Sequence, residues 1–218
     1  MSVHFSISLL VFLMAASWVY FWAYPSFYFS MTGAVQGLTL VFLVDVVLGP
    51  LLSFLVYNPA KPKKEIISDF AIIGMVQLSA LVYGLNTLYQ EKPSAVIVYP
   101  NSSATVVGYR ELADFPQLGG LSKYSTLGTL PVAVYYPSKK GDDYIPLSEA
   151  IDVLNSTDIA TRKNIQMSSP DDVNTLNDIE TKHGRVYVIG LMAKYNGAYI
   201  VLDKNLQYLT KFGEKPIS

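Results

Sequence analysis

Residues 35–57 read VQGLTLVFLVDVVLGPLLSFLVY, a run of 23 almost wholly apolar residues with one full charge, Asp45, near its middle. An α-helix of this length spans about 34 Å, which is enough to cross the hydrocarbon core of a bilayer with slight tilt. A carboxylate at the centre of such a helix costs on the order of 2.5–3.5 kcal/mol to insert. We therefore expect Asp45 to face a partner group rather than lipid.

A Gly-Pro pair interrupts the same helix one turn after Asp45. Pro50 has no N–H, so the carbonyl of Val46 should lose its helical partner and the turn should open. A four-residue spacing places Gly37, Val41, Asp45 and Gly49 on one side of the helix. This side offers a carboxylate, a loosened turn and little side-chain bulk.

Two interpretations of Asp45 follow. In the first, its side chain hydrogen-bonds within its own helical bundle, to Gln77 or Asn86, and fixes the packing. In the second, it receives a polar or charged group from another chain or from a substrate. The sequence leaves both open.

Two further apolar runs predict two more membrane helices, over residues 5–24 and 66–89. The first has no basic region before it and is rich in aromatic residues at its end, which favours an uncleaved membrane helix over a signal peptide. The third carries Gln77, Ala80 and Gly84 on one narrow face suited to helix packing. Residues 1–92 are thus predicted to form a three-helix transmembrane unit.

The loop between the second and third helices holds Lys61, Lys63 and Lys64. Basic residues in short loops favour the cytoplasmic side. The N-terminus is then expected in the cytoplasm of a bacterial inner-membrane protein, and everything after Gln90 outside, which is the periplasm in a Gram-negative cell.

Residues 93–218 differ in composition, with twelve basic and thirteen acidic side chains against four and four in residues 1–92. Alternating apolar residues predict strands at 95–99, 105–109 and 132–136, and short helices at 147–154 and after Ser169-Pro170-Asp171-Asp172. The last part, 185–212, is predicted as an antiparallel three-stranded meander with a hairpin turn at Asn196-Gly197. The fold class expected is therefore a membrane protein with three transmembrane α-helices followed by a soluble extracytoplasmic α+β domain.

No catalytic constellation is found. Cysteine is absent, so the chain has no disulfide, thiolate metal site or cysteine nucleophile. The two histidines, His4 and His183, lie on opposite sides of the membrane in this topology. The near-neutral charge of both halves does not suggest nucleic acid. We expect no enzymatic activity, no cofactor, no metal and no small-molecule substrate.

The membrane half resembles a known family. The runs that carry the resemblance are LVDVVLGPLL at 43–52, VYNPAK at 56–61, SDFAII at 68–73 and LSALVYG at 78–84. The segment D-x-x-x-G-P followed by N-P-x-K is similar to type IV pilin accessory proteins, the TfpX/TfpZ or FimB-like group, over about residues 35–100. The resemblance implies an inner-membrane protein that supports the stability or assembly of a type IV pilin without being part of the fibre.

The leading hypothesis is an accessory factor or chaperone that contacts the pilin helix in the membrane and the pilin head outside. The bilayer and the major pilin are then its partners. The candidate partner-binding residues are Asp45, Gly49, Pro50, Gly37, Gln77 and Gly84. The alternatives are a membrane-embedded enzyme that modifies pilin or lipid, with Asp45 catalytic, and a small sensor or transporter accessory subunit.

Overall fold

The computed structural model describes residues 2–99, 102–118, 120–121, 124, 126–127, 129–138, 141–147, 149–150, 167 and 169–217. The chain divides into two compact units, Met1–Lys92 and Pro93–Ser218.

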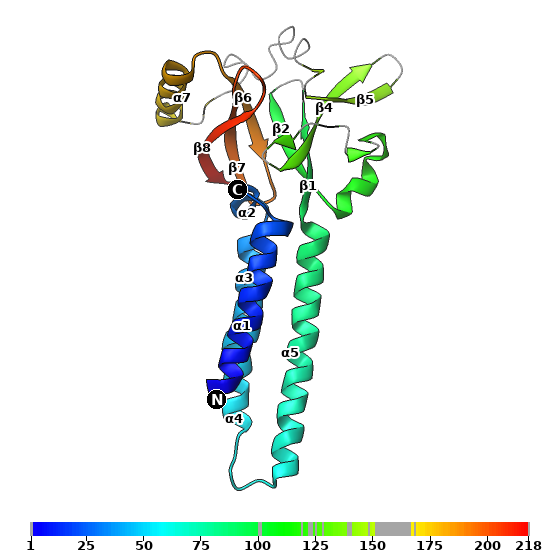
Figure 1. The fold of residues 1–218 in the computed structure, drawn as a ribbon, viewed down its shortest axis with the longest axis vertical. Helices are drawn as coiled ribbons and strands as arrows, with labels where there is room; N and C mark the ends of the chain where they lie inside the picture. Colours follow the sequence, from blue (N-terminus) through cyan, green and yellow to red (C-terminus); the bar gives the residue numbers. More distant parts are fainter. Residues whose placement is uncertain are drawn as a thin grey trace. The chain divides into compact units, whose positions relative to one another are not determined.

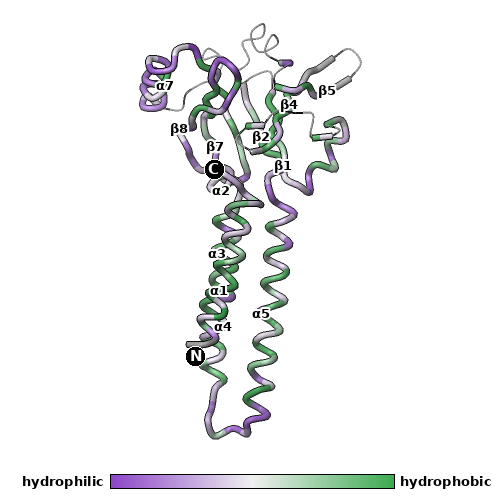
Figure 2. Tube along the Cα trace, viewed as in Figure 1, coloured by the Kyte–Doolittle hydropathy of each residue, from purple (hydrophilic) through white to green (hydrophobic). Residues whose placement is uncertain are grey.

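Helices make up the first unit (Figure 1). Three continuous helical stretches, 4–23, 34–56 and 63–91, are long and apolar enough to cross a membrane, as the sequence predicts. The elements are α1 (Ser2–Trp18), the π-helical turn η1 (Val19–Ala23), α2 (Tyr28–Met31), α3 (Ala34–Phe42), the π-helical turn η2 (Leu43–Leu48), α4 (Gly49–Val56) and α5 (Lys63–Glu91). Figure 2 shows their apolar colouring and the hydrophilic loop between α4 and α5.

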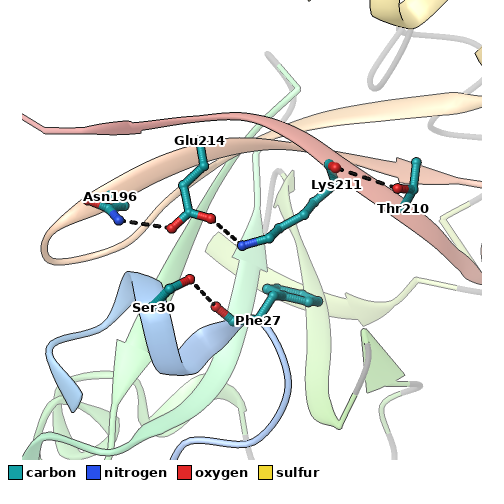
Figure 3. A network of polar contacts seen from close by, with 6 residues as sticks. All are labelled: Phe27, Ser30, Asn196, Thr210, Lys211 and Glu214. Atoms are coloured by element: carbon teal, nitrogen blue, oxygen red, sulfur yellow. Dashed lines mark hydrogen bonds and ion pairs between the residues drawn. The ribbon is translucent and has the colours of Figure 1, made fainter. Parts of the chain in front are cut away.

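The connection between the first two spans is a tight turn. The hydroxyl of Ser30 donates to the carbonyl of Phe27 at 3.2 Å (Figure 3). Gly33 has a φ of 102°, a left-handed conformation that residues with a Cβ rarely adopt, and it starts α3. The chain can therefore reverse within a few residues and enter the second span.

The second unit is built on one eight-stranded sheet. Its strands are β1 (Pro93–Val98), β2 (Ser103–Gly108), β3 (Thr126–Leu127), β4 (Leu130–Ser138), β5 (Gly141–Pro146), β6 (Tyr187–Met192), β7 (Asn196–Leu202) and β8 (Tyr208–Pro216). Their order is β3-β4-β1-β2-β6-β7-β8, with β5 paired to β4. The β1–β4 and β2–β6 pairs are parallel, and the other described pairs are antiparallel.

The predicted three-stranded meander is wrong as an architecture. The last three strands do pair in sequence order, but β6 also pairs with β2, through Ser103–Gly190 and Thr105–Met192. The strands therefore continue a larger sheet. This pairing joins residues far apart in the chain, so local alternation of apolar residues could not reveal it.

The hairpin turn also lies elsewhere than predicted. Asn196 and Gly197 belong to β7, where Gly197 pairs with Met192. The N–H of Ala193 donates to the carbonyl of Asn196 at 3.1 Å and closes a turn through Lys194 and Tyr195. On the adjoining strand, the Glu214 carboxylate accepts from the Asn196 amide at 2.9 Å and pairs with Lys211 (Figure 3).

The helix predicted after Ser169 is present as α7 (Pro170–His183). The Ser169 hydroxyl accepts from the N–H of Asp172 at 3.2 Å, which caps the helix, and Leu176 packs in a buried cluster with Val188 and Val201. Of the helix predicted at 147–154, residues 148 and 151–154 lie outside the described residues. The described part is a turn, closed by a hydrogen bond from the Ala150 N–H to the Pro146 carbonyl.

Candidate functional site

The π-helical turn η2 is the local structure that positions Asp45. In this turn the N–H of Gly49 donates to the carbonyl of Val44, five residues back instead of four. The next bond in that register would join residue 50 to the carbonyl of Asp45, but Pro50 has no N–H. The proline therefore leaves the Asp45 carbonyl without a donor from the helix backbone, whereas the sequence predicted this for Val46.

A side chain from α5 supplies the missing donor. The Gln77 amide Nε2 donates to the Asp45 backbone carbonyl at 3.1 Å. Of the first interpretation from sequence, in which Asp45 hydrogen-bonds to Gln77 or Asn86, the structure shows the bond from Gln77, to the backbone carbonyl of Asp45. In a membrane, an unpaired carbonyl costs several kcal/mol, so this bond repairs the helix where the proline breaks it.

The same glutamine connects to α1. Its Oε1 lies 3.0 Å from His4 Nε2, and His4 Nδ1 lies 2.8 Å from the Ser53 hydroxyl. An amide oxygen only accepts, so Nε2 of His4 carries the hydrogen, and in a neutral imidazole Nδ1 then accepts from Ser53. The result is a directed chain of hydrogen bonds from Ser53 through His4 and Gln77 to the Asp45 carbonyl, and it joins all three spans.

The Asp45 carboxylate lies beside this chain but outside it. The residue is 5% exposed, and neither carboxylate oxygen has a hydrogen-bond partner among the described residues. Such an orphaned pair of acceptors is unusual, because buried polar atoms are nearly always satisfied. Hydrogen bonding of the carboxylate to Gln77 or Asn86, as in the first interpretation from sequence, is not observed.

The glycines on the predicted face are sites of close approach. A Cβ built at Gly49 would lie 1.7 Å from Gln77 Nε2, so only glycine leaves room for the amide that bonds Asp45. A Cβ at Gly37 would lie 2.4 Å from Leu88 Cδ2, and one at Gly84 would lie 3.1 Å from Val41 Cγ2. The structure therefore brings Gly37, Gly49, Gly84 and Gln77 into contacts between the second and third spans.

Helix α5 otherwise packs loosely within the first unit. Among its residues, all of which the structure describes, only Leu88 is buried. Its backbone carbonyl also accepts from the Tyr24 hydroxyl at 2.9 Å. By contrast, the middle and C-terminal parts of the span 34–56 bury Asp45, Val46, Gly49, Pro50 and Ser53.

Sequence reasoning missed His4 and Ser53. Ser53 continues the four-residue spacing that runs through Asp45 and Gly49, and that spacing was the signal that could have found it. The partners of His4 lie 49 and 73 residues away, beyond the reach of any local pattern. Within the described part of the chain, no group of three or more metal-ligating side chains occurs.

Comparison with known proteins finds relatives over 95 residues, or 44% of the chain. The fimbrial assembly protein of serogroup I from Dichelobacter nodosus is 41% identical, and the match covers 37% of that protein. The fimbrial assembly protein of serogroups C1 and C2 from the same organism is 40% identical, with 72% of its length covered. The chain thus spans less than half the length of the serogroup I protein, and likewise of the serogroup E1 fimbrial assembly protein from the same organism. No protein-family model and no solved structure matches.

Proposed function

The chain belongs to the family of fimbrial assembly proteins, and on that premise we propose that it is an inner-membrane accessory factor for a type IV pilin. It stabilises the pilin, or aids its assembly, through helix contact inside the membrane and head contact outside. Its role is binding rather than catalysis.

The observation that carries this proposal is the buried carboxylate of Asp45, in the middle of a membrane-spanning helix and without a hydrogen-bond partner among the residues that the structure describes. Intramembrane ionisable residues are expensive and mark functional sites by default. Both nitrogens of His4 are engaged by Gln77 and Ser53, so the imidazole is not directed at the carboxylate as a catalytic base would be. This arrangement supports recognition over the alternative of a membrane enzyme.

The proposed orientation places the loop between α4 and α5 in the cytoplasm and Pro93–Ser218 in the periplasm. It rests on Lys61, Lys63 and Lys64. In that loop Lys61 forms an ion pair with Asp69 at 2.8 Å, and this hydrogen bond raises the pKa of the Lys61 ammonium. Reporter fusions after Tyr57 and after Pro93 should give opposite signals, cytoplasmic and periplasmic. The same signal from both fusions would refute the orientation.

The function is tested by Asp45→Asn and Asp45→Leu in cells that make pili. Both variants should lower pilin abundance or piliation several-fold if the charge matters, while the level of this protein stays normal. If hydrogen bonding suffices, only Asp45→Leu should do so. A matched control is Ser79→Leu, because Ser79 is exposed on α5 and its hydroxyl donates to the Met75 carbonyl of its own helix.

Normal pili in the Asp45→Leu strain would refute the role of Asp45 in assembly. In-cell crosslinking followed by identification of the trapped protein then tests the partner itself. Recovery of a transporter in place of a pilin would select the alternative of a transporter accessory subunit.

A further inference from the structure

We propose that the Asp45 carboxylate is the receptor for a cationic nitrogen, a lysine or arginine side chain or a free amine, carried by a membrane helix of the partner. We further propose that α5 moves aside to admit it. This inference rests on the proposed function, which makes the partner a membrane-spanning protein.

The chemistry of the occupant follows from what the carboxylate lacks. Two carboxylate oxygens offer about four acceptor positions, and no described residue donates to them. A cation with several N–H groups supplies both the donors and the opposite charge, and charge-assisted bonds of this kind are about twice as strong as neutral ones. A neutral hydroxyl or amide would satisfy only part of this need.

Among the described residues of the first unit, no lysine or arginine lies at the depth of Asp45. Asp45 lies eleven residues from either end of the span 34–56, which is about 17 Å at 1.5 Å per residue. The lysines of residues 1–92 are Lys61, Lys63, Lys64 and Lys92, all at or beyond the ends of α5. Both ring nitrogens of His4 are engaged by Gln77 and Ser53, so we assign the cation to another chain.

Access to the carboxylate requires movement, because the residue is only 5% exposed. Helix α5 is the element held least firmly. Its contacts with the second span include Gln77 over Gly49, Gly84 against Val41 and Leu88 against Gly37, and none of its 18 most apolar consecutive residues is buried. Lipid tails are as apolar as these side chains, so separating α5 from the second span exposes little that lipid cannot cover.

Gln77 is the side chain of α5 that bonds this helix to Asp45, so its hydrogen bond must break when α5 moves. Its amide donates to the backbone carbonyl of Asp45, the residue whose carboxylate has no donor among the described residues. An incoming cation donates stronger hydrogen bonds to the carboxylate of the same residue. These bonds can compensate for the Gln77 hydrogen bond that is lost when α5 moves.

The occupant is tested with the full-length chain in lipid nanodiscs and three synthetic 20-residue Leu/Ala helices. The helices carry Lys, Gln or Leu at the central position and are otherwise identical. The Lys helix should bind at least tenfold more tightly than the Leu helix, and Asp45→Asn and Asp45→Leu should abolish this preference. Equal binding of the Lys and Leu helices, or a preference that survives Asp45→Leu, would overturn the inference.

The movement of α5 is tested by a reversible lock. The chain has no cysteine, so Val41→Cys with Gly84→Cys creates a unique pair. A Cβ built at Gly84 lies 3.1 Å from Val41 Cγ2, the atom whose place a cysteine sulfur would take, so the two positions are close enough to test as a disulfide. Oxidation should reduce binding of the Lys helix to the level of the Leu helix, and reduction should restore it. Each single-cysteine variant is the control.

Undiminished binding to the locked protein would show that α5 does not move. Failure of this inference is separable from failure of the proposed function. If the helices bind alike while Asp45→Leu still depletes pilin in cells, the cation site is wrong and the assembly role stands. If the Lys preference is present while Asp45→Leu cells make normal pili, the site stands and the assembly role is wrong.

Discussion

Different kinds of residue stabilise the interiors of the two units of this chain. In the second unit the interior is apolar, with Ile97, Val132, Leu176 and Ile200 fully buried. In the first unit an apolar cluster lies around Val19, Tyr24 and Leu88, but the three spans are also joined by hydrogen bonds of Ser53, His4, Gln77 and the Asp45 carbonyl. In water, burial of apolar surface drives packing. In lipid it does not, and hydrogen bonds and close contacts take over.

The largest difference between the units should appear when leucine is truncated. Leu176→Ala in α7 removes a fully buried side chain and should lower the stability of the second unit by about 2–5 kcal/mol through lost burial and a cavity. Leu78→Ala in α5 removes a side chain that is 62% exposed and should change stability little. Hydrogen exchange of the full chain in nanodiscs measures both. Similar losses at the two positions would contradict the comparison.

Glycine substitutions, in contrast to leucine truncation, should lower stability strongly in the first unit. Gly49→Ala forces a methyl group to within 1.7 Å of Gln77 Nε2, so the amide must leave the Asp45 carbonyl, at a cost of about 1–3 kcal/mol. Gly74→Ala on α5 is the matched control, because nothing lies within 4 Å of its Cβ position. Unfolding from bicelles should rank Gly49→Ala as most harmful, then Gly37→Ala, Gly84→Ala and Gly74→Ala. A flat series would mean that the spans are not held by close contact.

These contacts show what the sequence could and could not reveal. The three spans and the start of α7 depend on local signals, namely apolar length and the Ser169-Pro170 cap, and they were predictable. The face of the second span with Gly37, Asp45 and Gly49, and that of the third span with Gln77 and Gly84, follow from helical spacing. The depth of the Asp45 burial and the β2–β6 pairing depend on segments distant in sequence. The π-helical turn escaped because the sequence argument assumed an α-helix throughout this span.

The hydrogen bond between Gln77 and the Asp45 carbonyl should matter only while Pro50 is present. Pro50→Ala restores an N–H that can donate to a carbonyl one turn back. In that background Gln77→Leu should be less harmful than in the natural chain, with a coupling energy of about 0.5–1.5 kcal/mol in a double-mutant cycle. Bicelle unfolding of the four proteins gives this energy. Additive effects would show that Gln77 does not compensate for the proline.

The smallest effect is expected at Gly197, where sequence and structure disagree. A turn at Asn196-Gly197 would require positive φ and would make Gly197→Val harmful. In the structure Gly197 lies in β7, with a φ outside the left-handed region, and its Cβ would meet the Leu191 carbonyl at an ordinary 3.5 Å. Gly197→Val should therefore change the free energy of unfolding by no more than about 0.5 kcal/mol.

Gly213→Val is the positive control, a variant that should clearly destabilise the second unit. Gly213 has a φ of 64°, and its Cβ would lie 2.8 Å from Tyr199 Cδ2 and 2.9 Å from Asp172 Oδ1. Valine there combines backbone strain of about 1–3 kcal/mol with these clashes. Hydrogen exchange across β7 and β8 in the full chain compares the two variants. If Gly197→Val proves as damaging as Gly213→Val, the turn lies at Asn196-Gly197 after all, and the β6–β7 register shown here is wrong.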